Sequence, residues 1–212
     1  MGSLTLGFGG SAAYAFIPAI LRDFRVRYPG VTITLDQLPL IEQMPALKSR
    51  RIDLGFVLLP CEDPSIGFEA MMRDRLVIVV PADHPLASRS AVHLRELKAY
   101  DFVGFSRAGR FGYHGHTMEI CRQAGFLPRI ARESAPMVSV IGLVASGIGI
   151  ALVPSMARGL QMADVRYVRL KDKHAHMDFA FAWNKDRFSP VLRTFLSVAR
   201  ETVKRGLPAA AK

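Results

Sequence analysis

Strand-like and helix-like segments alternate along nearly the whole chain, and this alternation limits the possible folds more than any other feature of the sequence. In the first helical run Phe16, Ile20 and Phe24 fall on one face, and Pro18 either begins the main part of that helix or kinks it. The predicted strands here are 4–8, 31–36 and 52–59, with helices over about 12–28 and 42–51 between them. This order, β-α-β-α-β, predicts a parallel, doubly wound unit.

A second α/β unit follows in the remaining sequence. The expected strands are 75–81, 102–106, 129–134, 148–154, 165–170 and 178–184, and the expected helices lie near 93–98, 113–125, 137–146 and 189–204. In the last helix Leu192, Phe195, Leu196 and Ala199 share one side, which we expect to face inward. The pattern therefore predicts two α/β lobes.

The composition is that of a globular domain with a basic surface. The chain has 212 residues, and its 28 Lys and Arg against 18 Asp and Glu give a net charge of +10. Such a charge indicates either an anionic partner or simply a solvated basic surface. The basic residues are dispersed and not interleaved with exposed aromatic residues, so we do not expect this chain itself to bind nucleic acid.

Several signals that would place a protein outside the cytoplasm are not found in the sequence. It contains no apolar stretch of membrane-spanning length and does not begin with a secretory signal. The two cysteines, Cys61 and Cys121, show no pairing pattern, so we expect both to be reduced. We therefore expect a cytoplasmic protein that has no membrane contact.

The segment Gly-Phe-Gly-Gly-Ser-Ala at 7–12 joins the first predicted strand to the first helix. It matches the dinucleotide-binding pattern G-x-G-x-x-A, with Asp36 near the position of the ribose-binding acid. Gly9 and Gly10 would let any anion approach the free backbone N–H groups, and Ser11 offers a hydroxyl. The alternatives are a nucleotide, a small carboxylate, or a Ser11 that only caps the helix. Because Pro18 interrupts the start of the helix, the nucleotide is the least favoured of the three.

Four sets of residues together resemble one known family. The first is Pro18, Phe24, Tyr28, Pro29 and Gly30; the second is Leu47, Asp53, Leu54 and Gly55; the third is the run 76–87; the fourth is the run 142–154 with Gly147, Gly149 and Pro154. In this order and spacing, over residues 4–204, the chain resembles the effector-binding domain of LysR-type transcriptional regulators. It looks most like the subgroup that controls the breakdown of aromatic compounds.

The resemblance implies a fold and a set of partners. The fold would be α/β, two Rossmann-like lobes joined by two crossover strands, as in type 2 periplasmic binding proteins. Lobe I would comprise 1–75 plus 178–212, and lobe II 76–177. The family's N-terminal winged helix-turn-helix is absent from this sequence, so DNA would be bound only through that missing domain. The implied partners are a small-molecule effector, a second copy in a homodimer, further copies in a tetramer of the full-length protein, and RNA polymerase. No cofactor is implied.

The resemblance also directs attention to the two loops that would face the effector. Ser11 would meet the effector's carboxylate, whereas Leu40 stands where the family often has Ser or Thr and favours an apolar ligand face or plain packing. Arg107 or Arg110 could meet a carboxylate, or both could be solvated. The predicted effector-binding residues are Gly10, Ser11, Leu40, Phe105, Phe111, Tyr113, Met137 and Phe179.

Enzymatic and metal chemistry are not supported by the motifs. The pairs His114/His116 and His174/His176 have the H-x-H spacing of metal ligands, but no carboxylate or cysteine stands at ligand spacing to either pair. No nucleophile elbow, zinc-protease or phosphate-loop motif occurs. We therefore expect a non-enzymatic domain without metal that binds an aromatic or carboxylate effector to control transcription. The alternative is a solute-binding protein of a transport system with the same fold.

Overall fold

The computed structural model describes residues 2–9, 16–60, 63–107 and 112–205. The chain forms two compact units, which we call unit 1 (Met1–Arg73 with Asp178–Lys212) and unit 2 (Asp74–Met177). Two strands, β4 (Ile66–Pro81) and β10 (His176–Asn184), contain the boundary between the units. Within the described residues, none of the helices combines the length and apolar character that crossing a membrane requires.

Unit 1 is built on a parallel β-α-β arrangement. Strand β1 (Gly2–Phe8) pairs in parallel with β2 (Val31–Gln37), and a bridge from Leu6 to Leu54 leads to β3 (Gly55–Leu58). Strand β10 then pairs antiparallel with β3, from Phe179 opposite Leu58 to Ala182 opposite Gly55. The predicted parallel unit therefore carries one antiparallel strand supplied by the C-terminal part of the chain.

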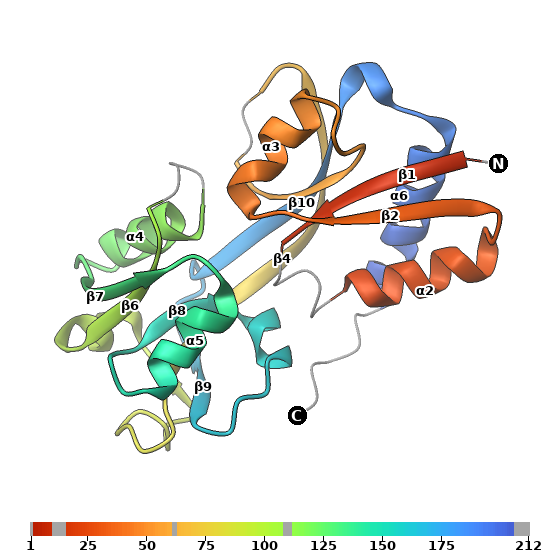
Figure 1. Cartoon of the computed structure of the whole chain (residues 1–212). Helices are drawn as coiled ribbons and strands as arrows, with labels where there is room; N and C mark the ends of the chain where they lie inside the picture. The colour runs from red at the N-terminus through yellow and green to blue at the C-terminus, as the bar shows by residue number, and fades with distance from the viewer. Residues whose placement is uncertain (1, 10–15, 61–62, 108–111, 206–212) are drawn as a thin grey trace. The chain divides into compact units, whose positions relative to one another are not determined.

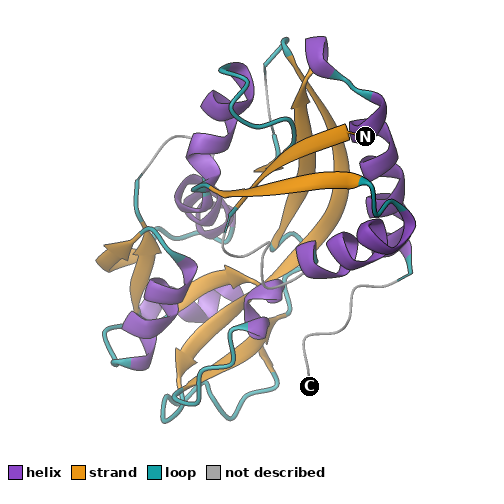
Figure 2. Ribbon diagram, turned by 45° about the vertical axis from the view of Figure 1, so that its right-hand side comes forward, coloured by secondary structure: helices purple, strands orange, loops and turns teal. Residues whose placement is uncertain are grey.

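Helices cover both sides of these strands (Figure 2). Helices α2 (Ile17–Arg27) and α6 (Pro190–Lys204) lie on one side of β1 and β2, and α3 (Leu40–Lys48) lies on the other (Figure 1). Proline stands in the first turn of α2, as the sequence allowed, and the predicted inward residues of both α2 and α6 are buried. The ring of Phe24 in α2 packs 5.2 Å from that of Phe195 in α6. Packing of these two apolar faces fixes the helices against the sheet.

Unit 2 repeats the parallel pairing and adds antiparallel strands. Strand β6 (Asp101–Phe105) pairs in parallel with β7 (Arg129–Ser134), and α4 (Tyr113–Gln123) and α5 (Met137–Ala145) flank them (Figure 1). The part of β4 in this unit pairs antiparallel with β8 (Ala151–Pro154) and β9 (Val165–Leu170), and β9 pairs in parallel with β5 (Ala91–Val92). The core of the unit lies between α5 and strands β4, β6 and β8.

Short 3-10 helices complete both units. They are η1 (Leu94–Ala99) and η2 (Ser155–Gly159) in unit 2 and η3 (Lys185–Arg187) in unit 1.

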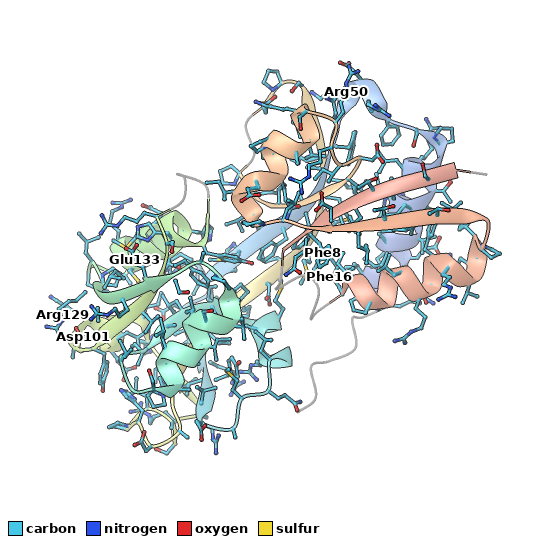
Figure 3. The ribbon with its side chains drawn as sticks, in the orientation of Figure 1. Phe8, Phe16, Arg50, Asp101, Arg129 and Glu133 are labelled. Carbon is cyan, nitrogen blue, oxygen red and sulfur yellow. The ribbon has the colours of Figure 1, made fainter. Side chains whose placement is uncertain are left out.

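Several element boundaries differ from the sequence prediction, each for a local reason. Helix α3 ends before Arg50, which is labelled in Figure 3, and not at 51, because Arg50 takes a left-handed φ of 63°. Strand β3 begins at Gly55 and not at 52, since the N–H groups of Asp53 and Leu54 both donate to the Thr5 carbonyl. Strand β8 begins at Ala151 and not at 148, after a turn in which Gly147 has a φ of 79°. Strand β4 begins nine residues before the predicted 75, at Ile66.

Candidate functional site

The first candidate region lies where β1 and β2 end, because ligands of open α/β sheets bind outside the carboxyl ends of the strands. We call Phe8, Gly9 and Leu38–Leu40 the unit 1 edge. The Leu38 N–H donates to the Phe8 carbonyl at 3.0 Å, so the two chain segments stay joined just beyond the paired strands. Leu38 is buried, and Leu40 is half-buried as the first residue of α3.

Gln43 is a buried polar residue behind the unit 1 edge. Its side chain has no exposed surface, its Oε1 accepts from the Phe56 N–H at 2.6 Å, and its Nε2 donates to the Leu38 carbonyl at 3.4 Å. Gln43 is not among the site residues predicted from the sequence. A signal was present, because Gln43 stands three and four positions before Ala46 and Leu47, which are both buried and therefore mark the inward face of α3.

The structure describes two of the four predicted site residues of unit 1. Gly10 and Ser11 lie outside the described residues. Leu40 lies at the unit 1 edge. Phe179 is fully buried in β10, where its ring is stacked on that of Phe56 with centroids 5.1 Å apart and planes 10° apart. An effector role for Phe179 stays a prediction, and its ring already has an aromatic partner.

The second candidate region lies where β6 and β7 end. We call Phe105, Ser106, Tyr113, Ser134 and Met137 the unit 2 edge. The rings of Phe105 and Tyr113 lie 4.8 Å apart, and both residues pack with Met137 in the core cluster of the unit. The Ser106 N–H donates to the Ser134 carbonyl at 3.0 Å, which extends the strand pairing by one residue. Three predicted site residues thus come together here.

The starts of two helices belong to the unit 2 edge. The residue before α4 is Gly112 and the residue before α5 is Pro136, and neither side chain can accept a hydrogen bond from the first turn of its helix. Backbone N–H groups at such positions favour a negatively charged partner. The edge therefore combines a buried ring, Phe105, and a half-buried ring, Tyr113, with backbone donors suited to a carboxylate.

Arg107 follows the unit 2 edge and already has a carboxylate partner. Its Nε lies 3.0 Å from Glu133 Oε1, and three quarters of the arginine side chain is exposed. Figure 3 shows Glu133 near one end of β7 and the ion pair of Arg129 with Asp101 at the other. Phe111 and Arg110 lie outside the described residues.

Both histidines of the first H-x-H motif make structural hydrogen bonds. His114 in α4 donates from Nδ1 to the Phe105 carbonyl at 3.0 Å, and His116 donates from Nε2 to the His176 carbonyl at 2.8 Å. The first bond holds the start of α4 to the end of β6, and the second holds α4 to the start of β10. Among the described residues, no three His, Cys, Asp or Glu side chains are grouped as a metal ion would require.

Charged side chains stand on both sides of the boundary between the units. In unit 1 the Arg73 guanidinium donates to both oxygens of Asp178, at 2.7 and 2.9 Å. In unit 2 Asp74 is buried and accepts from the Ser155 hydroxyl at 2.5 Å and from the Met156 N–H at 2.9 Å. Burial raises the pKa of Asp74 above its ordinary value, although these hydrogen bonds oppose the rise. Asp74 thus holds the start of η2 and is not exposed as a general acid or base.

Comparison with known proteins identifies relatives over nearly the whole chain. A family model described as the LysR substrate binding domain matches residues 1–204. The HTH-type transcriptional regulator AlsR of Bacillus subtilis is 30% identical over 198 residues, which cover 93% of this chain and 66% of that protein. TfdS of Cupriavidus pinatubonensis, also an HTH-type transcriptional regulator, is 32% identical over 200 residues, covering 94% and 68%. The chain thus spans about two thirds of the length of these relatives.

A solved structure has the same fold. The effector-binding domain of BenM, determined with its effector benzoate, superposes with a TM-score of 0.83 at 28% identity, covering 96% of this chain and 91% of that one. The similarity confirms the predicted α/β fold class of the type 2 periplasmic binding proteins. The relatives are transcriptional regulators, which agrees with the expectation of a non-enzymatic domain and favours it over a transport protein.

Proposed function

Because this chain belongs to the LysR substrate binding domain family, we propose that it senses a small organic acid with an aromatic or other apolar body. The observation that carries the proposal is the unit 2 edge, where Phe105, Tyr113 and Met137 pack together beside the starts of α4 and α5. Aromatic side chains bind the flat face of an aromatic acid, and the helix N–H groups favour its carboxylate.

Each unit has its own proposed contact residues. The backbone at Gly10 and the Ser11 hydroxyl would meet the carboxylate from unit 1, and Leu40 would contact the apolar body. In unit 2, the proposed contacts with the effector are Phe105, Phe111, Tyr113 and Met137. In unit 1, Phe179 would support the apolar side. Effector binding would change the populations of the conformations of the chain, by no more than its difference in affinity for them.

We propose that the whole protein is a regulator that acts on DNA in the cytoplasm. Its DNA-binding region would lie outside this chain, as the HTH-type names of the relatives suggest. It would assemble as a homodimer of this domain, as a tetramer when full length, and would contact RNA polymerase. The dimer would use α2 and α4. Ile20, Phe24 and Ile120 face the core of their own unit, so the contacts would come from exposed residues such as Val26, of which 78% is exposed.

A binding measurement tests the proposal. Benzoate and a panel of aromatic and aliphatic acids are screened for a rise in melting temperature, since a ligand that binds only the native state stabilises it. Calorimetry then compares the wild-type chain with Ser11→Ala, which we expect to lose about 1 kcal/mol of binding free energy, the net value of one hydrogen bond. Ser3→Ala, an exposed serine in β1, is the control.

Two outcomes would contradict this assignment. Equal affinity of Ser11→Ala and Ser3→Ala for the same acid would remove Ser11 from the site. Absence of any stabilising acid in the panel would remove organic acids as the class of effector.

A further inference from the structure

Gln43 is a fully buried amide on the inward face of a helix that is otherwise apolar on that face. The neighbouring inward residues of α3 are Ala46 and Leu47. Burying an amide costs free energy unless its polar atoms are hydrogen-bonded. Both the oxygen and the nitrogen of Gln43 have backbone partners, so the cost is met by bonds to two different chain segments.

The first bond provides an acceptor for the Phe56 N–H, which the pairing of the strands does not satisfy. Strand β3 pairs with β10 on one side, and on the other its predecessor Leu54 accepts from the Gly7 N–H at 2.8 Å. The pairing with β1 stops at this isolated bridge between Leu6 and Leu54, and the Phe56 N–H donates to Gln43 Oε1 at 2.6 Å. A buried N–H without a partner would be costly, so this bond anchors the amide firmly.

The second bond reaches the unit 1 edge. Gln43 Nε2 donates to the Leu38 carbonyl at 3.4 Å, and Leu38 in turn donates its N–H to the Phe8 carbonyl at 3.0 Å. Leu38 is therefore held by one hydrogen bond at its N–H and one at its carbonyl. It stands two residues before Leu40. The amide joins the ends of β1 and β2 to the middle of the β3 ladder.

The Gln43 amide has two glycines as close neighbours, Gly55 and Gly9. A Cβ on Gly55 would lie 3.2 Å from Gln43 Oε1, closer than ordinary packing, and a Cβ on Gly9 would lie 3.9 Å from Nε2. Gly55 thus allows the amide to approach β3 closely enough for its short bond. Gly9 lies beside the same amide at an ordinary contact distance.

We propose that Gln43 is a positioning residue of the effector site: its amide fixes the Leu38–Leu40 segment and so sets effector affinity without touching the effector. The inference rests on the proposed function. Gln43 holds the unit 1 edge in its binding geometry. The bond from the Phe56 N–H fixes the position of the amide, and the bond to the Leu38 carbonyl holds the edge.

Two variants separate the two bonds. Gln43→Leu removes both, whereas Gln43→Glu keeps an acceptor for the Phe56 N–H and loses the donor to the Leu38 carbonyl. Thr202→Val is the matched control. Thr202 is equally a buried polar residue of unit 1, and its hydroxyl donates to Asp23 at 2.7 Å in α2, on the opposite side of the sheet from α3.

Benzoate is the probe, and its affinity is measured by calorimetry well below the melting temperature of every variant. We expect Gln43→Leu and Gln43→Glu to bind benzoate about tenfold more weakly than the wild type, which corresponds to about 1.4 kcal/mol. Thr202→Val should bind like the wild type even where it is equally destabilised. Equal losses in all three variants would overturn the proposal, because they would show a general effect of destabilisation.

A pH profile gives a readout that a purely structural role would not change. The new carboxyl group in Gln43→Glu is buried, which raises its pKa, and its protonated form again donates a hydrogen bond. The ratio of variant to wild-type affinity, which cancels the protonation of benzoate itself, should recover as the pH falls from 8 to about 5. A ratio that stays constant across this range would contradict the role of the Leu38 bond.

Hydrogen exchange distinguishes failure of this proposal from failure of the proposed function. The amides of Leu38 and Glu42, which donate to Phe8 and Pro39, should lose protection in Gln43→Leu but not in Thr202→Val. If wild-type chain binds neither benzoate nor any acid of the panel, the proposed function fails while exchange still tests the positioning. Unchanged protection in Gln43→Leu would overturn the positioning whatever the ligand.

Discussion

The two edges of the molecule are held by the same kind of bond, made by different side chains. In unit 1 Gln43 of α3 donates to the Leu38 carbonyl beyond β2, and in unit 2 His114 of α4 donates to the Phe105 carbonyl at the end of β6. Each is a side chain of the helix that follows the strand. A strand-end carbonyl has lost its ladder partner, and the next helix supplies a donor for it.

The surroundings of these two donors differ. Gln43 is fully buried and uses both its oxygen and its nitrogen, whereas His114 is half-buried and lies beside the paired rings of Phe105 and Tyr113. Water can replace the donor in unit 2 more easily than in unit 1. We therefore infer that unit 1 depends on its amide for shape, and that unit 2 depends on aromatic packing.

The largest expected effect tests that aromatic dependence. Phe105→Ala should lower the free energy of unfolding by about 3–5 kcal/mol, because Phe105 is buried in the core cluster of unit 2. Leu40→Ala, the corresponding apolar change at the unit 1 edge, should cost only about 1 kcal/mol because Leu40 is half-buried. Urea denaturation measures both. Equal costs would show that the unit 2 edge is no more a part of the core than the unit 1 edge.

Sequence patterns predicted the parts of this comparison that depend on local periodicity. The inward faces of α2 and α6 follow from apolar residues at helical spacing, and all of those residues are buried. The approach of Tyr113 and Met137 to the end of β6 follows from the β-α-β order, since such a strand is followed by the start of a helix at the same edge. Family resemblance supplied the identity of the fold, which periodicity alone could not.

The parts that were missed depend on tertiary context. Strand β4 begins at Ile66 because β10 pairs beside it, and its first half alternates half-buried and exposed residues without an apolar run. The pairing of β1 with this segment stops at the isolated bridge from Leu6 to Leu54, and the buried Gln43 accepts from the Phe56 N–H instead, which no local pattern reveals. The H-x-H spacing of His114 and His116, which we expected not to hold a metal, gives two hydrogen bonds to backbone carbonyls that the sequence did not predict.

An intermediate effect is expected at His114. His114→Ala should lower the free energy of unfolding by about 1 kcal/mol, the net value of a single partly exposed hydrogen bond. This loss should be smaller than that of Gln43→Leu, which leaves a fully buried N–H without a partner. His174→Ala is the control, because His174 is exposed and should change stability little. A loss at His114 as large as that at Gln43 would show that both edges depend on their donors alike.

The smallest effect is expected at Arg107, and it decides how the unit 2 edge would recognise a carboxylate. Its ion pair with Glu133 is exposed, and such pairs contribute between about 0 and 1 kcal/mol, so Arg107→Gln should barely change stability. If helix N–H groups meet the carboxylate, benzoate affinity should also be unchanged and should depend weakly on salt. Glu133→Gln frees the guanidinium and is the complementary variant. Weaker binding in Arg107→Gln together with tighter binding in Glu133→Gln would show that Arg107 exchanges Glu133 for the effector, and the unit 2 edge would then recognise charge as well as an aromatic ring.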